Sequence, residues 1–155
     1  MVISPEWLAG FFDGEGCISA TVAGKRRRVI LRLSLVNTDY AVMRTIAVEY
    51  NGQFVVRKAS RPGWKTPYHV IWTNTQAKSL LAKIGHLIIL KRQQVKLALA
   101  FLELRDSPER FTLELVSVKN HKSGTVPKRR ITQDMLAREE AIKQEFHRLN
   151  RKGAA

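Results

Sequence analysis

The chain has 155 residues, 45% of them hydrophobic, which is enough for one domain with a single core. It contains no apolar run of about 18 residues and no signal-peptide pattern at its start, so we expect an intracellular protein with no membrane span. Lys and Arg number 27 against 13 acidic residues, a net charge of +14, although residues 1–16 carry three acids and no base. This balance favours a nucleic-acid partner over the alternatives, a generally basic surface or a binder of anionic membranes.

The first predicted elements are a helix and a hairpin. The sequence Ser4-Pro5-Glu6 is typical of a helix start, because serine caps the N-terminus, proline fits the first turn and an acid favours that end. The helix is expected to end near residues 14–16. Apolar residues then alternate over 18–22 and again over 29–35, which predicts a β-hairpin with one apolar face and one basic face.

The rest of the chain repeats this order and then adds further elements. In chain order we expect a helix beginning after Thr38 or Asp39 and ending at Asn51-Gly52, a hairpin over 53–58 and 68–73, a helix from about Thr75 to Gly85, a longer helix over about 88–104, a short element from Ser107, a basic loop over 119–130 and a final helix over about 132–149. The sequence therefore predicts a single domain over 1–155, with an αββαββα core at about 4–105 and a basic loop and C-terminal helices at 106–155.

The stretch WLAGFFDGEG, residues 7–16, places three glycines and two acids at the end of the first helix. Each glycine weakens a helix by about 1 kcal/mol relative to alanine, and acids oppose the helix dipole at a C-terminus. Gly10 and Gly14 share one helix face, and a face without side chains lets another backbone approach closely. The same helix of a second copy is the simplest partner, and it would bring two Glu15 carboxylates together around a cation. The alternative is a helix C-cap at Gly14 or Gly16 with solvated acids.

Residues 8–16, LAGFFDGEG, resemble the signature of the LAGLIDADG homing endonucleases. The resemblance implies an α+β fold, αββαββα, with a saddle-shaped antiparallel sheet. It implies a metal-dependent enzyme that hydrolyses both strands of DNA at a long near-palindromic site and promotes the mobility of an intron or of its own reading frame. Members with one motif copy are homodimers, and they work in the compartment of the host gene, an organelle or a bacterial or archaeal cytoplasm. The expected interface residues are Trp7, Gly10, Phe11 and Gly14.

The resemblance also implies the catalytic residues. Glu15 stands at the position of the family's catalytic acid and is expected to bind Mg²⁺, one Glu15 from each subunit, with the Gly14 carbonyl as a further ligand; Mn²⁺ or Ca²⁺ can occupy the same site. Asn37 is expected to orient water, unless it only forms the turn before the next helix. Lys91 is expected to support the metal-bound water or the phosphate, unless it is a solvated helix charge. Asp13 is expected to fix the helix end or to support the site indirectly.

DNA recognition is expected from the hairpin faces that are not apolar, because a two-stranded ribbon fits the major groove. The candidates are Ser19, Thr21, Arg26, Arg28, Arg32 and Ser34 on the first hairpin and Arg57, Arg61, Trp64, Lys65, His69 and Thr73 on the second. The basic loop, with Lys128, Arg129 and Arg130, is expected to follow the DNA backbone, to be disordered without DNA, or both. We expect Trp7 to be a core residue rather than a base-stacking one, and Cys17 to be small and buried rather than a nucleophile.

Two other functions fit the same fold. One is an RNA-binding maturase that assists splicing of its host intron without cutting, and the other is a transcription regulator that only binds DNA. The combination of an acid at Glu15 with Lys91 favours the nuclease over both. The four histidines lack the spacing of zinc ligands, and the DGEG segment is not followed by the Lys-Ser/Thr of a phosphate-binding loop, so neither chemistry is expected.

Overall fold

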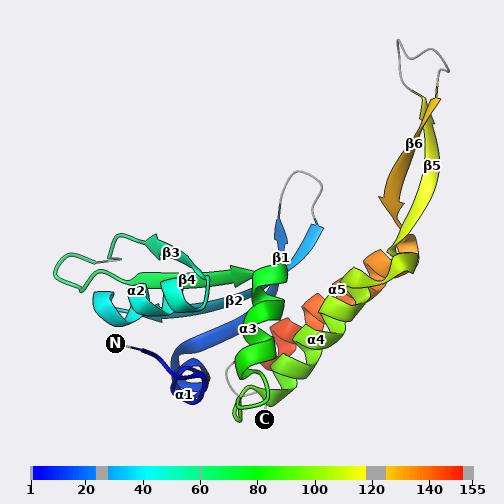
Figure 1. The fold of residues 1–155 in the computed structure, drawn as a ribbon. Helices are drawn as coiled ribbons and strands as arrows, with labels where there is room; N and C mark the ends of the chain where they lie inside the picture. Colours follow the sequence, from blue (N-terminus) through cyan, green and yellow to red (C-terminus); the bar gives the residue numbers. More distant parts are fainter. Residues whose placement is uncertain (1, 24–27, 60, 118–124, 152–155) are drawn as a thin grey trace.

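The computed structural model describes residues 2–23, 28–59, 61–117 and 125–151, which form an α+β fold (Figure 1). In chain order its elements are α1 (Pro5–Glu15), β1 (Gly16–Ala23), β2 (Arg28–Asn37), α2 (Tyr40–Glu49), β3 (Gln53–Val56), β4 (Tyr68–Thr73), α3 (Thr75–Ile84), α4 (Arg92–Asp106), the 3₁₀-helix η1 (Pro108–Arg110), β5 (Phe111–Ser117), β6 (Thr125–Ile131) and α5 (Gln133–Leu149). The αββαββα order predicted from the sequence is confirmed. No helix of these ranges is sufficiently long and apolar to cross a membrane.

The central sheet is antiparallel, with the strand order β1-β2-β4-β3. Alternate residues of β2 (Val29, Leu31, Leu33 and Leu35) are buried in the core, as their spacing predicts. Trp72 of β4 is fully buried and donates its indole N–H to the carbonyl of Tyr50 at 2.8 Å. The intervening residues of β2, such as Arg32 and Ser34, project from the opposite side of the sheet, which we call the open face.

Three helices begin with side-chain caps at or beside the positions the sequence predicts. Ser4 Oγ accepts the N–H of Trp7 at 3.2 Å, Asp39 Oδ1 accepts the N–H of Val42 at 3.0 Å, and Thr132 Oγ1 accepts the N–H of Met135 at 3.3 Å. Each bond satisfies one of the N–H groups that a helix start leaves without an intrahelical partner. Local capping chemistry therefore defines the starts of α1, α2 and α5.

Two predicted elements differ in the structure. The long helix expected from about 88 begins only at Arg92, because the N–H groups of 89–91 bond to the distant Asp13 carboxylate and not along a helix. The basic loop expected over 119–130 is wrong for its second half, since Thr125–Ile131 is a strand paired antiparallel with β5. Residues 119–124 lie outside the described residues. Among the described residues after α4 there are thus the short η1, a hairpin and one α-helix, in place of the expected set of helices.

The C-terminal helix is attached to the body at two places. α5 lies along α4 and also contacts β1, and Asn150 Nδ2 donates to the Ile18 carbonyl at 2.8 Å (Figure 1). In the N-terminal half of α5, Glu139 forms a buried ion pair with Arg110. Burial raises the pKa of Glu139, although the charges of Arg110 and nearby arginines oppose this. From this anchored junction the β5–β6 hairpin projects away from the body (Figure 1).

Two glycines of the motif offer a matched stability test. A Cβ at Gly16 would lie 2.6 Å from Phe12 Cδ1 and closer still to the Phe12 carbonyl oxygen, whereas none of the described atoms lies within 4 Å of a Cβ at Gly14. We expect Gly16→Ala to lower the free energy of unfolding of the monomer by about 1–3 kcal/mol. Gly14→Ala should raise it by up to about 1 kcal/mol. Urea unfolding at concentrations where the chain is monomeric measures both, and equal stabilities would contradict this packing.

Candidate active site

The end of α1 is fastened to the segment that precedes α4. The Asp13 carboxylate accepts the backbone N–H groups of Ile89 at 2.7 Å, Leu90 at 3.1 Å and Lys91 at 3.1 Å. In return, Lys91 Nζ donates to the carbonyl oxygen of Asp13. The Lys91 ammonium is therefore held at the last turn of α1, across 78 residues of sequence. The expectation that Asp13 fixes the helix end is confirmed.

These contacts also determine the charge state of Asp13. Partial burial raises its pKa, but the three backbone N–H groups and the Lys91 ammonium together outweigh that effect and hold the pKa below the ordinary value of 3.8. A lowered pKa in the folded state means that the carboxylate stabilises the fold at pH values above 3.8. This contribution is lost as the pH falls through the folded-state pKa.

We expect Asp13→Asn to lower the free energy of unfolding at pH 7 by about 1–3 kcal/mol, because charge-assisted hydrogen bonds are replaced by weaker ones. The gap between wild type and variant should narrow below pH 4, where the wild-type carboxylate also becomes neutral. Urea unfolding across this pH range measures the gap. Asp134→Asn, at an exposed aspartate of α5, is the control and should show a much smaller effect. A gap that does not change with pH would contradict the role of the Asp13 charge.

Glu15 is the last residue of α1 and is exposed, as is Gly14 beside it. Within the described ranges, no three His, Cys, Asp or Glu side chains come together as ligands for a metal ion. Mg²⁺ in phosphate chemistry is usually held by one or two carboxylates together with substrate phosphates and waters. Glu15 offers one exposed carboxylate at this point of the fold, so a Mg²⁺ ion bound there would need further ligands from outside the described residues.

Asn37 is placed in a turn. Its Oδ1 accepts the N–H of Asp39 at 2.9 Å, which is the local role that the sequence left open as an alternative. Strand alternation puts Asn37 on the same side of β2 as the buried Leu35, whereas Ser34 lies on the open face. The water-orienting role of Asn37 stays a prediction.

The strand register gathers the predicted recognition residues on the open face. Ser19 pairs with Arg32, and Arg32 pairs in turn with Thr73. The next row runs through Cys17, Ser34, Ile71 and Gln53. Cys17 and Gln53 were not among the expected recognition residues, although extending the alternation back from Ser19 would have found Cys17.

His69 lies on the same face, in register with Val36 of β2. Burial lowers the pKa of His69, and the positive charges of Arg57 and Arg32 lower it further. The imidazole is therefore neutral at neutral pH, so one ring nitrogen donates a hydrogen bond and the other accepts one. A neutral imidazole can therefore both donate a hydrogen bond to a polar ligand and accept one from it.

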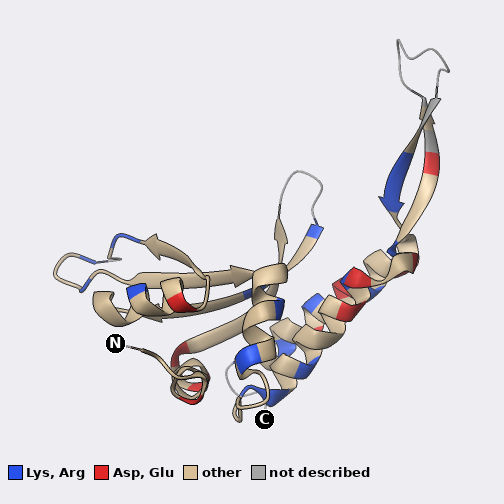
Figure 2. Cartoon of the chain, viewed as in Figure 1, with Lys and Arg blue, Asp and Glu red and all other residues tan. Residues whose placement is uncertain are grey.

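The remaining candidates lie in the segment between β3 and β4, on β6, or at the hairpin end of β1 and β2. Arg61 stacks over Trp64, with 5.1 Å from the guanidinium carbon to the ring centroid, in the exposed segment between β3 and β4 that also carries Lys65. Lys128, Arg129 and Arg130 are exposed on β6, which Figure 2 shows as a basic strand. Thr21 and Arg28 lie at the hairpin end of β1 and β2, and Arg26 lies outside the described residues.

The outer face of α1 is open. Leu8 and Phe12 are buried, whereas Trp7 is 48% exposed and stacks on Phe11 with ring centroids 5.0 Å apart. Trp7 and Phe11 line a hollow of about 370 Å³ together with Gly10 and Glu6. In the part of the chain that the structure describes, nothing lies within 4 Å of a Cβ placed at Gly10. The four residues predicted for the dimer interface thus share an uncovered face.

Two expectations of burial are wrong. Trp7 is half exposed, because it lies on the helix face opposite Leu8 and Phe12. Cys17 is exposed, because β1 alternates and buries its neighbour Ile18 instead. Trp7 lies on the outer face of α1 and Cys17 lies on the open face of the sheet, so neither contributes to the core.

No family model and no curated protein matches the chain. Solved structures do match. The homing endonuclease I-TnaI aligns with a TM-score of 0.68 at 20% identity, over 99% of this chain and 92% of that one. The homing endonuclease I-CvuI, in complex with its target, aligns with a TM-score of 0.67 at 19% identity, over 96% and 82%. The LAGLIDADG meganuclease I-AabMI, bound to uncleaved DNA, aligns with a TM-score of 0.64 at 18% identity, over 91% of this chain but 46% of its own.

These alignments run through the central sheet and extend to the C-terminal elements, since they cover nearly the whole chain. The nine-residue motif LAGFFDGEG forms α1 and its junction with β1. The identities are low, so what the likeness establishes is the architecture that the motif predicts. This chain has the fold of the LAGLIDADG homing endonucleases.

Proposed function

We propose that this chain is a homodimeric, Mg²⁺-dependent endonuclease that cuts both strands of a long, near-palindromic DNA site, in the homing of an intron or of its own reading frame. The observation that carries the proposal is the end of α1, where the exposed Glu15 lies next to the tie between Asp13 and Lys91. The open face of the sheet, with its arginines, begins directly after this point. I-Vdi141I, another solved structure of this fold, is complexed with DNA, and I-CvuI has been determined with Ca and with Mg.

The proposed assembly uses two copies because one copy supplies half of the site. This chain spans most of I-CvuI but less than half of I-AabMI. Packing of two α1 helices through Gly10 and Gly14 at a two-fold axis would bring both Glu15 carboxylates together. Two carboxylates that are held close together repel each other unless a cation lies between them.

The residues at and around the end of α1 would then have different roles in cleavage. Glu15 of each copy, with the Gly14 carbonyl, is proposed to hold the ion; bound Mg²⁺ supplies a Lewis acid and a water of lowered pKa. Lys91, fixed by Asp13, is proposed to stabilise the negative charge that develops on the scissile phosphate. Asn37 is proposed to orient water.

The open face is proposed to read DNA in the major groove, whose width admits a β-ribbon. Arg32 lies at the centre of this face, and an arginine that bonds guanine through two N–H groups contributes about 1–3 kcal/mol of discrimination. Ser19, Thr73 and His69 lie around it in the same register. The basic residues of β6 are proposed to contact phosphates. The protein would act within the cell, in the compartment of its host gene.

The test is cleavage of a plasmid that carries the uninterrupted form of the host gene. The expected result with Mg²⁺ is one linear product, arrest of cutting by a chelator, and recovery when Mg²⁺ is added back. Sedimentation should show two chains on one DNA site. Shifted but uncut DNA would favour a regulator without nuclease activity. Tight binding of the host intron RNA without DNA cleavage would favour a maturase.

A further inference from the structure

A second group of arginines lies away from Glu15. A hollow of about 510 Å³ is found where β2, the end of α4 and the start of β5 come together. Arg28, Arg105 and Arg110 line it, with Asn74 and Asp106. Arg105 and Arg110 have no part in the proposed cleavage or in the reading of bases by the sheet.

Arg110 is the buried member of this group and is 5% exposed. Its Nη1 donates to the Arg105 carbonyl at 3.1 Å, and its Nη2 pairs with Glu139. Its Nε has no hydrogen-bond partner among the residues that the structure describes. The two buried Glu139 oxygens also have no hydrogen-bond partner among these residues, so the ion pair is not fully satisfied within the chain. A buried donor without an acceptor is costly, and an acceptor that reaches Nε would lower that cost.

Positive charge exceeds negative charge around the hollow. Glu139 is paired with Arg110, and Asp106 is paired with Lys78. No ion pair of Arg28 or Arg105 is found within the described ranges. Burial lowers the pKa of Arg110. The charges of Glu139 and Asp106 oppose this, whereas the charges of Arg105 and Arg28 lower the pKa further, so both arginines act at the buried guanidinium. An anion would relieve this repulsion.

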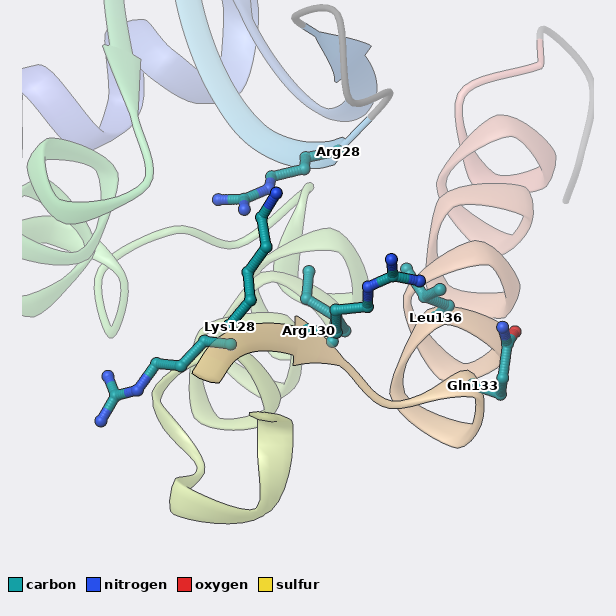
Figure 3. Close-up of a pocket in the computed structure, with 7 residues that line it drawn as sticks. Arg28, Lys128, Arg130, Gln133 and Leu136 are labelled. Carbon is teal, nitrogen blue, oxygen red and sulfur yellow. The ribbon is translucent and has the colours of Figure 1, made fainter. Parts of the chain in front are cut away.

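The basic surface continues beyond the hollow. Arg28 also lines a second hollow, of about 390 Å³, with Lys128 and Arg130 of β6. Figure 3 shows the Lys128 side chain ending beside Arg28, whereas Arg130 points toward α5. Arg130 is paired with Glu114, whereas no ion pair of Lys128 is found among the described residues. Arg28 therefore lines both hollows, the one beside the central sheet and the one beside the C-terminal hairpin.

We propose that the hollow lined by Arg28, Arg105 and Arg110 binds a phosphate group, which in the DNA complex is a backbone phosphodiester beyond the bases read by the open face. Guanidinium groups match phosphate oxygens with paired N–H bonds. A backbone contact of this kind carries no base information and holds the hairpin in register on the duplex. The DNA source of the phosphate rests on the proposed function, whereas the phosphate chemistry does not.

The first arm of the test measures DNA binding by Arg28→Gln/Arg105→Gln, which leaves the Arg110–Glu139 pair in place. Affinity for target and for unrelated DNA is expected to fall alike, by about tenfold. The slope of log affinity against log salt is expected to fall by about 1, the value for one lost phosphate contact. The control is Arg138→Gln/Arg148→Gln, which removes two exposed arginines of α5 and the same net charge. Equal losses and equal slopes in the two double variants overturn the DNA contact.

The second arm uses inorganic phosphate, titrated against chloride at constant ionic strength. Phosphate is expected to raise the Tm of the wild type and of the α5 control but not of Arg28→Gln/Arg105→Gln, because a ligand of the folded state stabilises it. A phosphate effect without a change in the DNA slope assigns the site to free phosphate. No difference in either arm overturns the proposal. Failure of the proposed function would appear separately, as absence of Mg²⁺-dependent cleavage by the wild type.

Discussion

Glu15→Gln is expected to reduce Mg²⁺-dependent cleavage by about 10³-fold or more while DNA binding is retained. The substitution keeps the size of the side chain but removes the charge proposed to hold the ion. Metal catalysis contributes several kcal/mol to such reactions, and each 1.36 kcal/mol is about tenfold in rate. Because Glu15 is exposed at the end of α1, the fold should be unaffected. Single-turnover cleavage and gel-shift assays measure the two properties.

Glu103→Gln is the matched control for this experiment. Glu103 is an exposed glutamate of α4, and its replacement changes the net charge by the same amount. Its cleavage rate should equal that of the wild type. If Glu15→Gln cleaves at the rate of this control, the chemistry does not depend on the end of α1 and the proposed catalytic centre is wrong.

Gly10→Leu is expected to convert the proposed dimer to a monomer. In one chain a side chain at this position meets no neighbour among the described residues, and replacing a helical glycine raises helix stability by about 1 kcal/mol. At a two-fold axis, however, two leucines hold the helices apart. Overpacking of about 1–3 kcal/mol from each copy weakens dimerisation at least about 30-fold. Sedimentation measures the dimer dissociation constant, and cleavage should fall with it.

Ala41→Leu provides the control for Gly10→Leu. Ala41 is exposed on α2, so this substitution places the same leucine side chain on a surface outside the proposed interface. The Ala41→Leu protein should dimerise and cleave as the wild type does. Unchanged dimerisation of Gly10→Leu would show that the outer face of α1 is not the contact surface, even if a dimer exists.

The part of the fold that could be predicted depends on local chemistry. Caps such as Asp39 and the alternation in β2 lie next to the elements they define, so the order through α3 follows from short windows of sequence. The start of α4 does not follow from its local sequence, because the residues before it are held by the distant Asp13. The β5–β6 hairpin was missed because its alternation faces solvent: Leu113 is 74% exposed and marks no core.

The site shows the same division. The motif marks Glu15 and Asp13 from the sequence, and the structure supplies the partner of Asp13. Asn37 was ambiguous because an asparagine after a strand serves either a turn or a site, and its bond to the Asp39 N–H is evident only in the structure. The hollow lined by Arg105 and Arg110 has no local sequence pattern, because Glu139, the acidic partner of Arg110, lies on a separate helix.

The passage from α1 to β1 has no connecting loop, since Glu15 ends the helix and Gly16 begins the strand. In the proposed dimer, the helix pair and the two reading sheets would therefore move as one rigid frame. Such a frame fixes the offset and rotation between the half-sites, and one extra base pair at the centre would separate them by about 3.4 Å and turn them out of phase. The length of the central DNA segment would then be selected as strictly as any base within the half-sites.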